Sequence, residues 1–210
     1  ALMASLSSQP LIVVLRPELE DLAPSRNSPP LLAVLEQLQL AGLRHVEVAW
    51  SAHPGWMSLM REVKAAFSDF SLGAASIHRV EALHAVKELG LSYAMTPCFD
   101  LSLQNQALEL QQLLVPGVFS PSEIHQACSI GCQLVKLFPA SVLGMNYWRQ
   151  IEAPLEPLPF VIAAGGLTVS DLTPWLAAGY NSVALGRGLI KQGRLDPALN
   201  AWLKDPTSNI

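Results

Sequence analysis

The chain has 210 residues, of which 50% are apolar and 14% charged, and its formal net charge is −4. A chain of this length and apolarity can bury a large core within one domain, which argues against general disorder. It has no run of Lys or Arg, so we expect neither a nucleic-acid partner nor a polybasic membrane anchor. Its longest apolar stretches are far shorter than a membrane span, so we expect no membrane association.

The cysteines and histidines constrain the cellular setting and the cofactors. The three cysteines, Cys98, Cys128 and Cys132, have no paired spacing, which indicates a reducing compartment and a cytoplasmic protein. No charged-then-apolar leader opens the chain, so we expect no secretory signal. No pair among the five histidines has the spacing of a zinc site, so we expect no metal.

Short apolar runs recur along the chain and are typical of strands covered on both faces, as in a parallel sheet. The eight predicted strands are Leu11–Leu15, His45–Ala49, Ser71–Ala74, Tyr93–Met95, Leu113–Val115, Leu134–Leu137, Phe160–Ala163 and Ser182–Leu185. Residues 17–30 contain four prolines, so we expect a loop between the first strand and the first helix. We expect the tail after Leu203 to fray.

Helical patterns lie between these runs, and each stops close to a glycine, which is a common helix end. The predicted helices are Leu31–Leu40, Arg79–Leu89, Ser122–Ile130 and Ser170–Ala178. Eight strands alternating with helices favour an α/β fold of the (β/α)8 TIM-barrel type, as a single domain over residues 1–210. The alternative is an open doubly wound sheet, but the G-x-G-x-x-G fingerprint of its nucleotide-binding form does not follow the first strand.

Lys136 is a charged residue inside the apolar strand Leu134–Leu137. Strand alternation points Lys136 in the same direction as Leu134 and Phe138, into a mostly buried place. Burial of an ammonium is costly unless the group is paired or its pKa falls, and a lysine with a lowered pKa forms Schiff bases with carbonyl compounds. The alternative is a core lysine that a carboxylate neutralises for packing.

Glu47 is the carboxylate that we expect to share a layer with Lys136. It lies on the second predicted strand and Lys136 on the sixth, and alternate strands of a barrel contribute to one interior layer. Beside a Schiff-base lysine, a carboxylate can move protons to and from the substrate. The alternative is a buried ion pair without chemistry.

Two glycine-bearing loops follow the last two predicted strands: Ala164-Gly165-Gly166 and Gly186-Arg187-Gly188. Barrels often bind phosphate there through loop amides, and the guanidinium of Arg187 would add donors suited to phosphate. These loops therefore predict a phosphate end of the site, although Gly-Gly alone is more often a plain turn.

These motifs resemble the family of 2-keto-3-deoxy-6-phosphogluconate aldolase and 4-hydroxy-2-oxoglutarate aldolase, over about residues 11–189. The most specific piece is Val135-Lys-Leu-Phe-Pro-Ala140, which is similar to the family's Schiff-base strand. The segment Ala41-Gly-Leu-Arg-His-Val-Glu-Val48 is similar to the one that carries the family's general acid/base. Val115–Val118 resembles the fifth strand and its loop, and Gly73–Ile77 resembles Gly-Ala-Gly-Thr-Val.

The resemblance implies that Lys136 forms an imine with a keto acid and that Glu47 carries protons as the C3–C4 bond breaks. Pyruvate and an aldehyde would leave, with neither metal nor organic cofactor, and family members are typically homotrimers. The resemblance also implies substrate-binding residues, which are Arg16, Ser76, Pro97, Phe138, Gly165, Gly166, Gly186 and Arg187.

The chain departs from the family pattern at the substrate-binding positions. The family has Thr-Leu-Arg-Thr after Glu-Val, and Ser51 stands where its carboxylate-binding Arg would be. Ala163-Ala164 replaces Pro-Thr before the two glycines, Cys98 replaces a Gly, and Gly186-Arg-Gly188 replaces Gly-Ser-Trp. Three readings remain open: a lyase acting through Lys136, a non-catalytic phosphate- or keto-acid-binding barrel, and a different phosphate-barrel enzyme such as an isomerase.

Overall fold

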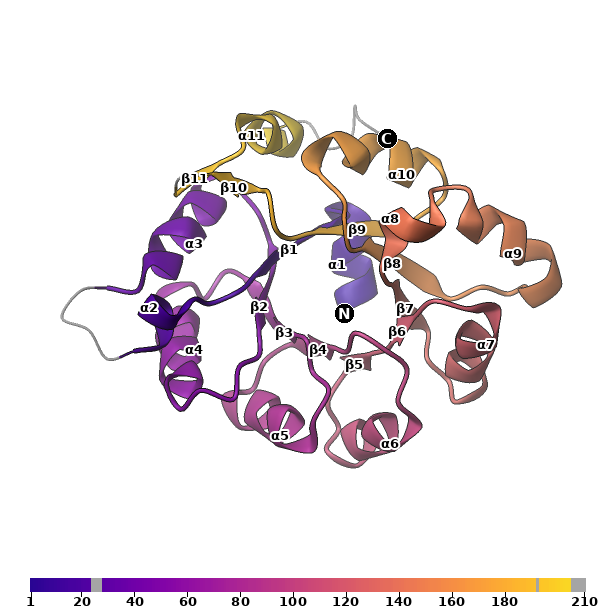
Figure 1. Ribbon diagram of the computed structural model, residues 1–210, viewed down its shortest axis with the longest axis horizontal. Helices are drawn as coiled ribbons and strands as arrows, with labels where there is room; N and C mark the ends of the chain where they lie inside the picture. Colours follow the sequence, from indigo (N-terminus) through magenta and orange to yellow (C-terminus); the bar gives the residue numbers. More distant parts are fainter. Residues whose placement is uncertain (24–27, 192, 205–210) are drawn as a thin grey trace.

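The structure is a computed structural model that describes residues 1–23, 28–191 and 193–204. Over these residues, nine parallel strands form one sheet with the order β5-β4-β3-β2-β1-β9-β8-β7-β6. The strands are β1 (Leu11–Leu15), β2 (His45–Ala49), β3 (Ser71–Ala75), β4 (Tyr93–Met95), β5 (Leu114–Val115), β6 (Gly117–Val118), β7 (Leu134–Leu137), β8 (Phe160–Ala164) and β9 (Ser182–Leu185). Figure 1 shows them as a ring surrounded by helices.

The ring closes at Pro116, which separates β5 from β6. β5 pairs with β4 and β6 pairs with β7, so the two short strands are halves of one strand. Pro116 lacks an N–H, but its carbonyl oxygen accepts a hydrogen bond from the backbone N–H of Lys136 at 2.9 Å. The eight predicted strands and the (β/α)8 barrel are therefore confirmed, with the fifth strand broken in two.

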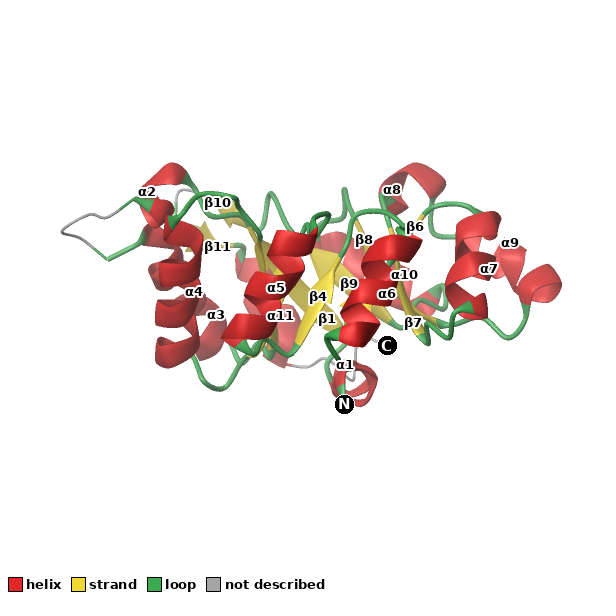
Figure 2. Ribbon diagram, turned by 90° about the horizontal axis from the view of Figure 1, so that it is seen from below, coloured by secondary structure: helices red, strands yellow, loops and turns green. Residues whose placement is uncertain are grey.

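Most helices form the outer layer of the barrel, whereas α1 lies across one end (Figure 1 and Figure 2). The helices are α1 (Leu2–Ser8), α2 (Leu19–Leu22), α3 (Pro30–Leu40), α4 (Gly55–Ala66), α5 (Val80–Leu89), α6 (Leu101–Glu109), α7 (Pro121–Ser129), α8 (Ala140–Leu143), α9 (Tyr147–Leu155), α10 (Leu172–Ala177) and α11 (Pro197–Lys204). A 3₁₀ turn at Val169–Asp171 leads into α10, and β10 (Ile190–Lys191) pairs antiparallel with β11 (Arg194–Leu195). No helix in the described part of the chain is long and apolar enough to cross a bilayer.

The predicted helices are confirmed with bounds shifted by about one residue, except that the last begins as the 3₁₀ turn. The predicted loop at residues 17–30 is wrong in part, because Leu19–Leu22 is a helical turn. The Asp21 carboxylate stabilises this turn by accepting from the backbone N–H of Glu18, and it also accepts from that of Leu31, both at 2.8 Å. Of the tail predicted to fray after Leu203, Lys204 is still helical in α11, and residues 205–210, like 24–27, lie outside the described residues.

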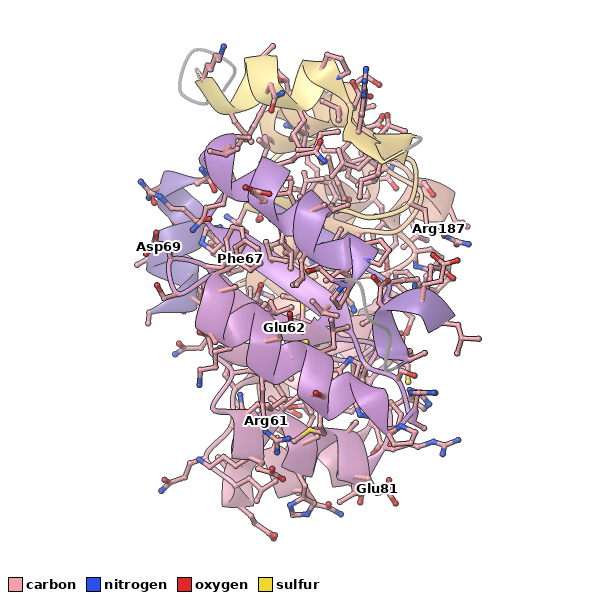
Figure 3. The ribbon with its side chains drawn as sticks, turned by 90° about the vertical axis from the view of Figure 1, so that its left-hand side faces the viewer. Arg61, Glu62, Phe67, Asp69, Glu81 and Arg187 are labelled. Carbon is pink, nitrogen blue, oxygen red and sulfur yellow. The ribbon has the colours of Figure 1, made fainter. Side chains whose placement is uncertain are left out.

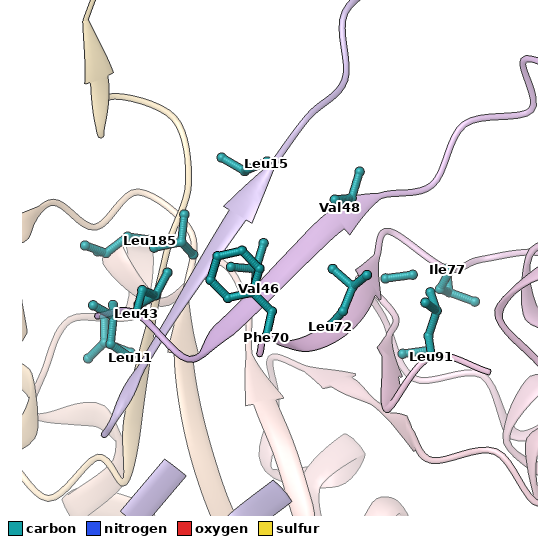
Figure 4. Packing of buried hydrophobic residues seen from close by; sticks show 14 of the residues in the cluster. Leu11, Leu15, Leu43, Val46, Val48, Phe70, Leu72, Ile77, Leu91 and Leu185 are labelled. Carbon is teal, nitrogen blue, oxygen red and sulfur yellow. The ribbon is translucent and has the colours of Figure 1, made fainter. Parts of the chain in front are cut away.

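Strand alternation divides the buried apolar side chains into an outer and an inner core. Val46 and Val48 of β2 and Leu72 of β3 belong to the outer core, which packs against the helices (Figure 4). Ile12, Ile162 and other inner residues fill the barrel, together with Leu2 and Leu6 of α1. Figure 2 shows α1 at one end of the barrel, while α2 and α8 lie at the other end. The helix α1 therefore closes the amino end and leaves the carboxyl ends of the strands for a site.

Hydrogen bonds of the His45 ring link α1 to the barrel. Its ring is fully buried, with Nδ1 3.1 Å from the carbonyl oxygen of Leu11 and Nε2 2.7 Å from the hydroxyl of Ser5. A carbonyl only accepts, so Nδ1 carries the proton and Nε2 accepts from Ser5 in a neutral ring. Burial lowers the pKa of His45, a hydrogen bond to the Leu11 carbonyl opposes this, and the charge of Arg44 lowers the pKa further.

The lowered pKa of His45 predicts a loss of stability in acid. Its value in the unfolded chain is near 6.5, so as the pH falls below this the unfolded chain takes up a proton that the folded protein resists. We expect the free energy of unfolding to fall between pH 7.5 and pH 5.5, and to fall less in His45→Gln. Urea unfolding at both pH values measures this, with the exposed His84→Gln as control. Equal pH dependence in wild type and His45→Gln would contradict the assignment.

Candidate active site

Lys136 projects from β7 into the carboxyl-end half of the barrel. All four residues of β7 are buried, and Lys136 is 7% exposed. Val135 and Leu137 belong to the outer core, so Lys136 points inward with Leu134 and Phe138, as the sequence predicts. The Lys136 Nζ lies 5.5 Å from the centre of the Phe138 ring, a favourable position for a cation over an aromatic face.

Glu47 faces the same interior from β2. It is 2% exposed, and its Oε1 is buried without a hydrogen-bond partner among the described residues. Over residues 1–23, 28–191 and 193–204, the only ion pair within 4.0 Å joins Arg61 and Glu88 on the surface. The Lys136 amine and the Glu47 carboxylate therefore do not touch, although both line one cavity. This separation leaves both groups available to a small molecule, unlike a closed ion pair.

Burial shifts the pKa of both groups toward neutrality. It lowers the pKa of Lys136 to about 8; Glu47 opposes that shift, Arg16 adds to it and Cys98 opposes it. Burial raises the pKa of Glu47 to about 7, and the nearby Lys136 opposes this. Near neutral pH, part of the Lys136 amine is therefore neutral, and the Glu47 carboxyl group can take up and release protons.

The cavity lies at the carboxyl ends of the strands and has a volume of about 740 Å³. It brings together all of the residues that the sequence singles out for catalysis or substrate binding: Lys136, Glu47, Arg16, Ser76, Pro97, Phe138, Gly165, Gly166, Gly186 and Arg187. Arg16 and Arg187 are exposed, and Ser76, Pro97 and Phe138 are half-buried. Figure 3 shows Arg187 at the edge of the molecule.

The two glycines after β8 are required by close approach and by backbone conformation. Gly165 and Gly166 have φ angles of 95° and 77°, which side-chain-bearing residues rarely adopt. A Cβ at Gly165 would lie 2.9 Å from the Phe138 ring, and one at Gly166 would lie 2.0 Å from the hydroxyl oxygen of Ser141. The glycine pair therefore lets the loop fold against Phe138, which lies on the same strand end as Lys136.

Sequence reasoning found Ser76 but missed its unusual backbone, and it missed the part of the cavity formed by the segment before α3. Ser76 has a φ of 61°, and strained residues of this kind cluster at functional sites. The cavity also extends along α2 and α3, over residues that include Glu18, Asp21, Leu31 and Val34. The spacing of Glu18 and Asp21, three apart as in a capping box, was the available signal for α2. Both Asp21 oxygens accept backbone hydrogen bonds, so this carboxylate shapes the wall.

A barrel with its cavity at the carboxyl ends of the strands places the chain among the (β/α)8 proteins whose sites lie at that face. The family model of KDPG and KHG aldolase matches residues 20–198, and the chain belongs to this family of Schiff-base aldolases. No three His, Cys, Asp or Glu side chains in the described ranges are placed to hold a metal ion.

Two curated relatives and one solved structure illustrate the similarity. The chain is 28% identical over 155 residues to the 2-dehydro-3-deoxy-6-phosphogalactonate aldolase of Escherichia coli K12, covering 73% of this chain and 75% of that protein. It is 27% identical over 185 residues to a probable enzyme of the same name from Rhizobium meliloti, covering 88% and 84%. A solved structure described as "Native KDPGal structure" has a TM-score of 0.77 at 25% identity, covering 95% and 93%.

Removal of the Glu47 charge should make Lys136 more reactive toward reagents other than the substrate. Glu47 raises the pKa of Lys136, so Glu47→Gln should lower that pKa and increase the neutral fraction of the amine at pH 7. We expect an amine-selective acylating reagent to modify Lys136 roughly threefold faster. Peptide mass mapping measures the rate, with the exposed Lys87 as an internal control. Unchanged or slower modification of Lys136 relative to Lys87 would show that the two charges are not coupled.

Proposed function

We propose that this chain is a Schiff-base aldolase that cleaves a 2-keto-3-deoxy sugar acid, phosphorylated or not, or 4-hydroxy-2-oxoglutarate, into pyruvate and an aldehyde. The observation that carries the proposal is the buried amine of Lys136, with a lowered pKa, in one cavity with the unpaired Glu47 carboxylate. An amine in this setting is a nucleophile toward carbonyl carbons. Membership of an aldolase family supports the same chemistry.

The proposed reaction uses Lys136 to form an electron sink. The neutral amine attacks the C2 ketone, the carbinolamine loses water, and a protonated imine results. The C4 hydroxyl then loses its proton, the C3–C4 bond breaks, and its electron pair passes into the imine to form an enamine as the aldehyde leaves. The enamine takes a proton at C3, and water hydrolyses the imine to release pyruvate. Glu47 carries the protons in these steps, because it faces the cavity with Lys136 and has a pKa raised toward neutrality.

Different residues of the cavity would bind the two ends of the substrate. Ser76 would bind the keto-acid carboxylate, with help from Arg16, because Ser51 does not line the cavity and provides no guanidinium. Arg187 and the amides around Gly165, Gly166 and Gly186 would hold the phosphate or other anionic end of the substrate. Pro97 and Phe138 would form the apolar wall between these ends.

We also propose that the chain assembles as a homotrimer, as the resemblance to the family implies. Exposed apolar side chains at the carboxyl end of the barrel, Phe119 after β6 and Val142 and Met145 in and after α8, provide surface for such contacts.

Covalent trapping tests the proposed function. Incubation with pyruvate and borohydride should leave a reduced adduct on the peptide that contains Lys136. The adduct should be absent in Lys136→Ala and retained in Lys87→Ala, which changes an exposed lysine of α5. A cleavage screen that compares phosphorylated and non-phosphorylated keto acids would then identify the aldehyde.

A second candidate, a non-catalytic keto-acid-binding barrel, is favoured by Ser51 at the position of the family's Arg. It predicts binding of pyruvate without a borohydride-dependent adduct. That outcome, or an adduct on a lysine other than Lys136, would contradict the proposed chemistry.

A further inference from the structure

Three polar side-chain atoms at inward-facing strand positions are buried and have no hydrogen-bond partner within the described residues: Oε1 of Glu47 and the hydroxyl oxygens of Tyr93 and Ser182. Tyr93 is fully buried and belongs to the inner core, and the proposed mechanism does not use it. Buried polar groups in proteins are nearly always hydrogen-bonded to protein or to ordered water. A shared partner would satisfy Glu47 and Tyr93 together, because these two residues lie in one row of the sheet.

The register of the sheet places Tyr93 next to Glu47 on the interior face. Glu47 pairs with Gly73 of β3, and Gly73 pairs with Tyr93 of β4, so the three residues lie in one row across the sheet. On its other side Glu47 pairs with Val14 of β1. Neither Val14 nor Gly73 has a hydrogen-bonding side chain, so Tyr93 is the nearest side-chain donor along this row.

Gly73 allows the Tyr93 ring to lie across β3. A Cβ at Gly73 would lie 2.6 Å from both Cε2 and Cζ of Tyr93, which shows that the ring occupies the space above the glycine. Cζ bears the hydroxyl, so the polar end of the side chain lies over the strand between β4 and β2. The charge of Glu47 raises the pKa of Tyr93 after the larger effect of burial, which agrees with this proximity.

We propose that Tyr93 is a positioning residue for Glu47: its hydroxyl donates a hydrogen bond to one ordered water, which donates to the carboxylate and holds it toward the Lys136 adduct. A water bridge is specified because the structure has no direct bond between the two groups, and an ordered water joins such groups nearly as well as direct contact. The inference rests on the proposed aldolase function. The titratable groups that face Glu47 from other strands are Lys136 of β7 and Tyr93 of β4.

The exchange of pyruvate methyl hydrogens with D2O, followed by proton NMR across pH 5–9, tests this role. Exchange requires the imine, which forms from the neutral amine, and a base that removes a C3 proton, so its acid limb reports the coupled ionisation of Glu47 and Lys136. Tyr93→Phe removes the hydroxyl and keeps the ring. Loss of the hydroxyl removes a group that stabilises the charged form of Glu47. The acid limb of the exchange profile should therefore move up by about one pH unit, and exchange at pH 6 should slow about tenfold. The rate above pH 8 should change little.

The buried Tyr180 provides the matched control, because its ring packs against Trp148 and Trp175 in the outer core. Tyr180→Phe should leave the acid limb in place, and circular dichroism verifies that both variants fold. The role of Tyr93 is overturned if Tyr93→Phe leaves the acid limb of the exchange profile in place, or if it lowers the exchange rate equally at every pH. In either case pyruvate would still be trapped on Lys136, so the aldolase function would stand. Failure of the wild type both to trap and to exchange pyruvate overturns the aldolase function and this inference with it.

Discussion

The burial of the Lys136 amine inside an apolar barrel is the constraint on which the rest of the site depends. Solvation favours an ammonium strongly, so placing it on β7 among inward-facing side chains disfavours its charged form. A carboxylate in contact would restore the charge, but Glu47 lies in the same cavity beyond ion-pair distance of the amine. The two groups therefore shift each other's titration while both stay accessible to a ligand.

The barrel provides this environment in two ways: side chains alternate between the two faces of each strand, and glycines leave room for neighbouring side chains. Each strand presents one set of residues to the helices and the other to the interior, so a charged residue can be placed inside without interrupting the outer core. Glycine then creates room: Gly73 makes space for the Tyr93 ring, and Gly165 for Phe138. At the amino end, α1 and the neutral His45 cover the barrel, and the cavity of the site lies at the carboxyl ends.

Sequence patterns predict the architecture because apolar periodicity and glycine stops are local signals. The eight strands and the positions of Lys136 and Glu47 on inward faces follow from them, and resemblance identifies eight further cavity residues, but not the wall along α2 and α3. The continuation of the fifth strand beyond Val115 as β6 was missed because Pro116 and Gly117 are residues that usually end a strand. The turn α2 was missed because its four residues are too few for a helical pattern, and the capping box of Glu18 and Asp21 was its only local signal. The row from Glu47 to Tyr93 depends on strand register, which becomes visible only in the folded sheet.

The measurement that tests the central claim most directly is a titration of the Lys136 amine in the absence of substrate. Lysine labelled with ¹³C at the ε carbon gives an NMR signal for each amine, and the signal missing in Lys136→Met identifies the residue. The account predicts a midpoint near pH 8, well below the usual value for lysine. A midpoint at or above about pH 10 would contradict it, because the amine would then be an ordinary ammonium and no nucleophile near neutral pH.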